Sequence, residues 1–211
     1  MKMLVKLIEL YSFTERWLEK TKVYKSYRDL NDYFDLYFSL YVVYNRIYNA
    51  ITFYQLDRGD VDKMIDEGIL PKDQRGDVKD KFSSTACVAY FLKNEIRDII
   101  KESSTEIEIF KIIITEKRFH IVFQKGVHQP NEDKKLLEGL SSTEPFVAVK
   151  SLLLFLYHIR CNIFHGEKGF DIRQREILGA ANSSLEKLIN RLKPKLNEIS
   201  IQLEEKLSSN M

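Results

Sequence analysis

The chain has 211 residues, of which 44% are hydrophobic and 30% charged, and its net charge is +2. This length can bury a substantial core without staples, and this composition excludes an intrinsically disordered chain. The small net charge excludes binding of nucleic acid by bulk electrostatics, so any RNA site must be local. The two cysteines lack a CxxC partner, which predicts neither a zinc site nor disulfides and favours a reducing, cytoplasmic setting.

The N-terminal stretch MKMLVKLIELYSF is interrupted by Lys6 and Glu9 and therefore lacks the apolar core of a signal peptide. No apolar run is expected to reach membrane-spanning length, and the longest, SLLLFLY, is interpreted as a core segment. These features predict a folded protein without membrane contact.

Helical periodicity begins early in the chain. Residues 1–29 are interpreted as an N-terminal helical elaboration, and residues 30–55 place tyrosines and aliphatic residues at steps of three and four, which predicts a long core helix. The following residues are polar and rich in turn formers, and leave room for a short helix at most. A second helix is expected from the SST triplet at 83–85, whose hydroxyls can cap it, through residue 103.

The middle of the chain departs from helical periodicity. Residues 106–124, EIEIFKIIITEKRFHIVFQ, alternate partially on both sides of TEKR, which predicts a β-hairpin within an insertion at 105–128, followed by a polar loop. A third long helix is expected over 146–165. A fourth is expected from Asp171 to about Leu207, kinked or interrupted at Pro194. The fold class is therefore mainly α, as a single domain over 1–211.

The third helix carries an anomaly at its end, in the stretch LYHIRCNIFHGEKGF. Apolar residues lie on almost every side of this helix, so the helix is expected to be covered by a second subunit or by the β insertion. Arg160 and His165 lie in these surroundings, where a charged or titratable group is costly unless it is paired or functional. Gly166 is a natural helix terminator, so His165 is expected at the helix end.

These residues resemble the RxxxxH motif of HEPN domains, helical nucleic-acid-processing domains. The pattern RNxxFHGxK of one branch is matched by Arg160, Asn162, Phe164, His165, Gly166 and Lys168, and is preceded by a helix with VVYNRIY at 42–48. The resemblance covers roughly residues 30–207 and implies an up-and-down bundle of four to five helices. One departure is Cys161, where the family usually has Asn, Asp or His, so either Asn162 supplies the polar contact or activity is weakened.

The resemblance implies a metal-independent endoribonuclease that cleaves RNA by attack of the 2′-OH. His165 would transfer protons near neutral pH, Arg160 would hold the phosphate, and Asn162 would orient the ribose, the phosphate or the histidine. HEPN families place the motif at a dimer interface, which implies a homodimer with a composite cleft. A toxin or phage-defence effector is the expected class, with an antitoxin as a further partner.

Other polar residues near the motif are weaker candidates. Asn45 and Tyr48 on the tyrosine-rich helix and Lys168 after the motif are named as possible substrate contacts, with structural roles as the alternative. No cofactor is expected, and four histidines without HxxxH or HxH spacing predict no metal site. His158 is interpreted as structural, and His120 and His128 as loop or strand-edge residues. Two other functions stay open: a non-catalytic module that binds RNA, nucleotide or a partner protein, and a structural dimerisation domain.

Overall fold

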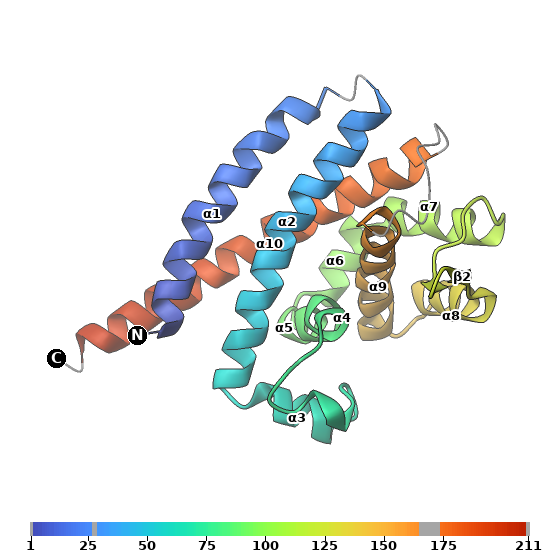
Figure 1. Ribbon diagram of the computed structural model, residues 1–211. Helices are drawn as coiled ribbons and strands as arrows, with labels where there is room; N and C mark the ends of the chain where they lie inside the picture. Colours follow the sequence, from blue (N-terminus) through green and yellow to red (C-terminus); the bar gives the residue numbers. More distant parts are fainter. Residues whose placement is uncertain (1, 27–28, 165–173, 210–211) are drawn as a thin grey trace.

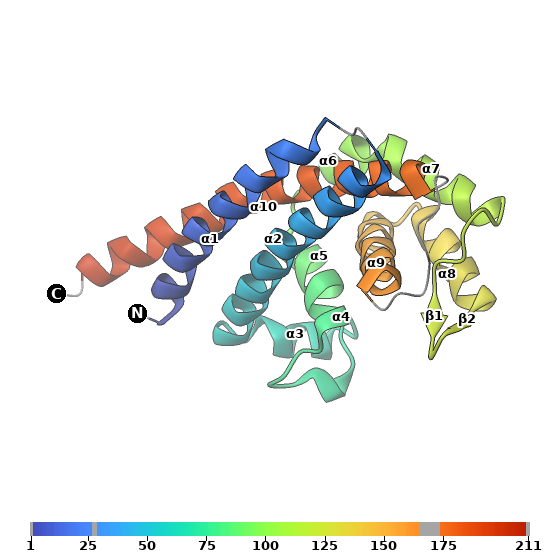
Figure 2. The same ribbon diagram turned by 45° about the horizontal axis from the view of Figure 1, so that its top comes forward.

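The computed structural model describes residues 2–26, 29–164 and 174–209, which are mainly helical with one small antiparallel sheet. The long helices α1 (Lys2–Tyr24) and α2 (Leu30–Asp57) pack along each other, and α10 (Gln174–Ser208) packs against both (Figure 1). The helix α9 (Pro145–Phe164) lies beyond α2, among the shorter helices (Figure 2). The mainly α class predicted from the sequence is therefore confirmed.

The predicted tyrosine-rich helix is confirmed as α2. It begins where Asp29 accepts hydrogen bonds from the backbone N–H groups of Asn31 and Asp32, which satisfies donors that have no partner within the helix. Its buried face includes Tyr37, whose hydroxyl donates to the carbonyl of Leu156 at 2.7 Å and so ties α2 to α9. The same periodicity that predicted the helix therefore places its tyrosines in the core.

The predicted fourth long helix is α10, whose expected start at Asp171 lies outside the described residues. No interruption occurs at Pro194, and the helix continues to Ser208. Leu192 and Leu196 on either side of the proline are fully buried. Their packing holds the helix together across a residue that lacks a backbone donor.

The region between α2 and α7 is more divided than predicted. Short helices follow α2 in the order α3 (Asp60–Asp66), η1 (Lys72–Gln74), α4 (Asp80–Phe82), the π-helical turn η2 (Ser83–Cys87), α5 (Val88–Phe91) and α6 (Ile96–Glu102). The prediction of a single helix from the SST triplet to residue 103 is therefore wrong. The hydroxyls of Ser83 and Thr85 donate to the carbonyls of Val78 and Lys81 instead of capping a helix start.

The π-turn η2 is held on α2 by two hydrogen bonds. The hydroxyl of Tyr44 donates to the carbonyl of Ser84, and the amide of Gln55 donates to the carbonyl of Cys87 at 2.9 Å. These bonds satisfy carbonyl groups in an irregular turn that is completely buried. The turn is thus specified by residues of α2 about thirty to forty positions earlier in the chain.

The strand predicted over residues 106–115 is wrong, because this segment forms α7 (Ser104–Thr115). Ile107, Phe110 and Ile114 recur at helical spacing and are buried on one face. Glu106 on the same helix accepts hydrogen bonds from Ser183 (2.6 Å) and Lys187 of α10. The many β-branched residues of this segment favoured the prediction of a strand, but packing against α10 stabilises it as a helix.

A hairpin does occur, later in the chain than predicted. The strands β1 (Phe123–Gln124) and β2 (Val127–His128) pair antiparallel, with Phe123 opposite His128. Lys125 and Gly126 between them have φ of 51° and 75°, the left-handed pair that a tight two-residue hairpin turn requires. The polar loop expected next is instead the helix α8 (Pro130–Leu140), with proline in its first turn.

The apolar helix α9 is covered from several sides by the chain itself. Contacts come from α5, α6, α8 and η2, and the ring of Phe155 stacks on Phe110 of α7 with the centroids 4.0 Å apart. Helices of the same chain therefore cover much of the apolar surface of α9, for which a second subunit or the β insertion was expected.

Within the described residues, Pro145–Ile163 of α9 is the one segment long and apolar enough to cross a membrane by length and composition alone. No run of membrane-spanning length was predicted from the sequence. Val149, Leu152, Leu153, Phe155 and Leu156 of this segment are fully buried among the other helices. A core helix of a soluble protein has the same composition, so the packing is compatible with the expected absence of membrane contact.

Candidate functional site

The side chain of Arg160 projects from the end of α9 into a polar cluster. Its Nη1 atom lies 3.9 Å from Oδ2 of Asp80 at the start of α4, and 4.0 Å from Sγ of Cys161. The guanidinium carbon lies 5.9 Å from the centre of the Tyr41 ring, within the range of a cation–π interaction. The side chain is 26% exposed, so the cation is partly desolvated yet reachable from solvent.

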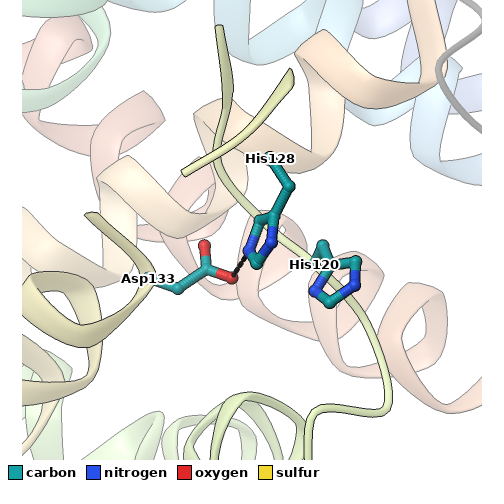
Figure 3. A group of neighbouring side chains, drawn as sticks. All are labelled: His120, His128 and Asp133. Carbon is teal, nitrogen blue, oxygen red and sulfur yellow. Dashed lines mark hydrogen bonds and ion pairs between the residues drawn. The ribbon is translucent and has the colours of Figure 1, made fainter. Parts of the chain in front are cut away.

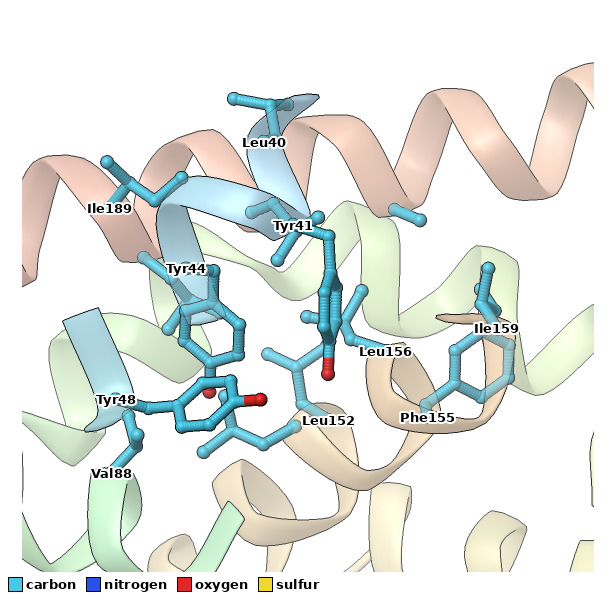
Figure 4. Close-up of a cluster of buried hydrophobic side chains, with 14 of the residues drawn as sticks. Leu40, Tyr41, Tyr44, Tyr48, Val88, Leu152, Phe155, Leu156, Ile159 and Ile189 are labelled. Carbon is cyan, nitrogen blue, oxygen red and sulfur yellow. The ribbon is translucent and has the colours of Figure 1, made fainter. Parts of the chain in front are cut away.

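Asn45 and Tyr48, the two candidate substrate contacts predicted on α2, lie in the same polar cluster as Arg160. The amide of Asn45 donates a hydrogen bond to the Tyr48 hydroxyl, which in turn donates to Asp80. Tyr41, Tyr44 and Tyr48 pack edge to face along α2, with neighbouring ring centroids 5.8 and 5.3 Å apart, and lie over Leu152 and Leu156 of α9 (Figure 4). We call Arg160, Asp80, Tyr41, Tyr48 and Asn45 the Arg160 cluster.

Burial determines what these residues can do. Tyr48 is completely buried, which is at odds with the direct substrate contact considered from the sequence, and Asn45 is half-buried. Burial, the nearby Tyr41 and the hydrogen bond to Asp80 raise the pKa of Tyr48 far above its ordinary range. The phenol therefore stays protonated and donates to the carboxylate, and so positions Asp80 beside Arg160.

Asp80 is the member of the cluster that the sequence analysis missed. It lies in the polar stretch GDVKDK, which was interpreted only as a turn-rich connection. An acidic residue just before a helical run was the available signal. Its contacts with Tyr48 and Arg160 span 32 and 80 positions of sequence and could not be predicted without the fold.

Asn162 faces away from this cluster. Its amide donates to the carbonyl of Ile121 at 3.0 Å, and the residue is buried. Two residues of an α-helix turn by about 200°, so Arg160 and Asn162 lie on nearly opposite faces. The described contact of Asn162 is structural, and the orienting role predicted for it gains no support from this geometry.

The remaining motif residues, His165 and Lys168, lie outside the described residues. The description of α9 ends at Phe164, the residue directly before His165. The predictions that His165 transfers protons and that Lys168 contacts a phosphate therefore stay predictions.

His158, which was interpreted as structural, is buried in α9. Burial, with a smaller contribution from Lys81, lowers its pKa from 6.5 to about 4, against the opposing effect of Asp133 and Glu132. The imidazole is therefore neutral at physiological pH, as expected for a packed core residue.

A dependence of stability on pH follows for His158. The unfolded chain, with an imidazole pKa of about 6.5, binds more protons than the folded chain between about pH 6.5 and about pH 4. Stability is therefore complete above this window and is lost as the pH falls through it. Between neutral pH and about pH 5 the loss from this group is about 2 kcal/mol.

Denaturant titrations of the parent protein and of His158→Gln at the two pH values measure this effect. We expect the parent to lose about 2 kcal/mol more than the variant on acidification. Equal losses in the two proteins would mean that His158 does not titrate abnormally.

Comparisons with known proteins add no assignment, since no protein-family model, curated protein or solved structure matches the chain. The HEPN resemblance therefore rests on the sequence alone.

Proposed function

We propose that the protein is a metal-independent endoribonuclease of HEPN type, which cleaves RNA by attack of the 2′-OH on the adjacent phosphate. One observation carries the proposal. The arginine of the RxxxxH pattern is partly exposed at the end of α9, within a cluster of polar residues from α2 and α4, and five positions before His165.

The chemistry divides between the two motif residues. Arg160 presents a permanently charged, planar donor group to the phosphate oxygens, which gain charge as the 2′-oxygen attacks. His165 takes the proton of the 2′-OH or returns one to the leaving 5′-oxygen. Asp80 holds the guanidinium in the absence of RNA, and an incoming phosphate competes with this carboxylate for the same donors.

A composite site completes the proposal. Two copies of the chain, each supplying one His165, would provide the acid and the base together, so the active form is proposed to be a homodimer. The proposed class is a toxin or phage-defence effector of the cytoplasm that acts on RNA and is restrained by an antitoxin. Lys168 would contact a neighbouring phosphate.

A second candidate is a non-catalytic HEPN-type module that binds RNA, nucleotide or a partner protein. Two contacts favour it. Arg160 already has Asp80 and Cys161 beside it, and the amide of Asn162 is bound to the carbonyl of Ile121. In this alternative the motif stabilises the end of α9 and cleaves nothing.

The deciding experiment incubates the purified protein with mixed cellular RNA in EDTA and scores the fragments for 2′,3′-cyclic phosphate ends. We expect such ends from the parent protein and their loss in His165→Ala. His120→Ala is the control, because it removes an exposed histidine that does not belong to the RxxxxH motif, and it is expected to cleave like the parent. Absence of cleavage by a folded parent protein would exclude the nuclease and favour the binding module.

A further inference from the structure

Three metal-ligating side chains from separate parts of the chain converge beside the hairpin (Figure 3). His120 lies in the connection after α7, His128 on β2 and Asp133 in the first turn of α8. One donor atom of each lies within 4.8 Å of the others. No metal site was predicted from the sequence, because these residues lack a familiar ligand spacing, and only the fold brings them together.

Their donor atoms are close to the separation that a metal ion requires. Bonds of about 2.0 Å at tetrahedral angles place neighbouring ligand atoms about 3.3 Å apart. Nε2 of His128 and Oδ2 of Asp133 are 2.8 Å apart and share a hydrogen bond that the ion would replace, and the rings of His120 and His128 face each other with centroids 3.8 Å apart. Modest rotations of the side chains, above all of the exposed His120, are enough to turn the three donors towards one point.

Asp133 is already oriented as a ligand would be. It is buried, and its two oxygens accept hydrogen bonds from the backbone N–H groups of Val122 (2.7 Å) and Ile121 (3.2 Å). A carboxylate offers about four lone-pair directions, so these two bonds leave capacity for an ion. Outer hydrogen bonds of this kind orient ligands in metal sites.

The tight hairpin turn fixes the second ligand. The left-handed pair Lys125 and Gly126 reverses the chain within two residues, so that His128 lies opposite Phe123 and two residues before α8 begins. The rings of Phe123 and His128 lie 5.8 Å apart and limit the freedom of the imidazole. Two of the three ligands are therefore held in place by the fold, and the exposed His120 closes the set.

Positive charge nearby is the main opposing effect. Lys117 and Lys134 line the same surface hollow as the three ligands, and both are exposed. Exposed charges near a protein surface interact by about 1 kcal/mol or less. This repulsion is small beside the bonds that two imidazoles and a carboxylate make to a transition metal, and the lysines favour an anion or hydroxide as the fourth ligand.

We propose that His120, His128 and Asp133 bind a Zn²⁺ ion, whose fourth position is open to a water or small anion from the hollow. Two imidazole nitrogens and one carboxylate select Zn²⁺ and its first-row neighbours over Mg²⁺ or Ca²⁺, which prefer oxygen ligands. The ion ties the hairpin to α8 and to the connection after α7. The proposed ligands do not include Arg160 or His165, which carry the proposed RNA chemistry.

The test measures metal binding and not activity. The full chain is freed of metal with a chelator and titrated with ZnCl₂ by calorimetry, and with Co²⁺ by visible absorption. We expect one saturable ion per chain, a Co²⁺ spectrum without thiolate charge-transfer bands, and a rise in the melting temperature with Zn²⁺.

Variants locate the ion. His120→Ala, at an exposed position, is expected to weaken Zn²⁺ binding at least about tenfold and to reduce the rise in melting temperature at a given Zn²⁺ concentration. His165→Ala is the matched control and is expected to bind Zn²⁺ like the parent. Asp133→Asn is expected to weaken binding while its one acceptor oxygen keeps one of the two backbone hydrogen bonds, with circular dichroism confirming that it is folded.

Three results would overturn the proposal: no saturable binding by the parent, unchanged binding by His120→Ala, or thiolate bands that assign the ion to a cysteine. Because the readout is binding, failure here leaves the ribonuclease proposal untouched. The reverse also holds, since loss of cleavage in His165→Ala says nothing about this site.

Discussion

Replacing Phe155 by alanine is expected to lower the free energy of unfolding by about 3 to 5 kcal/mol, the range for a large aromatic residue removed from a core. Phe155 is completely buried, and its ring stacks on Phe110 with an angle of 23° between the ring planes. The truncation removes the contact between α9 and α7 and leaves a cavity that the surrounding helices cannot fill. Because α9 carries Arg160, the same change loosens the element that holds the candidate site.

Urea titration of the parent, Phe155→Ala and Phe38→Ala measures this effect. Phe38 on α2 is the matched control, because it is the same residue type but 41% exposed, and its removal is expected to cost about 1 kcal/mol. Similar losses in the two variants would show that the Phe110–Phe155 stack is not a main contact of the core.

Replacing Arg160 by alanine is expected to reduce the rate of RNA cleavage by about 100- to 1000-fold while the fold survives. The loss follows because the guanidinium is proposed to stabilise charge that develops on the phosphate during attack. The fold survives because the ion pair with Asp80 is long, at 3.9 Å, and partly exposed. Such a pair contributes less than about 1 kcal/mol to stability. Single-turnover cleavage and circular dichroism measure the two quantities.

Two further substitutions separate charge from shape at this site. Arg160→Lys retains the charge but loses the planar pair of donors, so its cleavage rate is expected between those of the parent and Arg160→Ala. Asp80→Asn is the control for the resting contact. It keeps an acceptor for the Tyr48 hydroxyl, removes the competing negative charge, and is expected to cleave at least as fast as the parent. Full activity of Arg160→Ala would refute the proposed role of the arginine.

The long helices could be predicted from the sequence because their periodicity and their burial agree. In α2 and α10, apolar residues recur every three or four positions, and these same residues form the core. The segment that forms α7 shows two patterns at once: apolar and polar residues partly alternate, and apolar residues also recur at helical spacing. Its β-branched residues favoured the strand, whereas the contacts of Glu106 with Ser183 and Lys187 of α10 hold it as a helix.

The candidate site divides in the same way. The order of the long helices, the position of Arg160 at the end of α9 and the candidacy of Asn45 and Tyr48 could be predicted, because each depends on residue type and local spacing. The fold was needed to show that Asp80 joins these residues and that Asn162 turns to Ile121. It was also needed to show that His120, His128 and Asp133 converge. Side chains on separate elements meet through packing and through turns such as Lys125–Gly126. No local sequence pattern predicts which distant residues such packing and turns bring together.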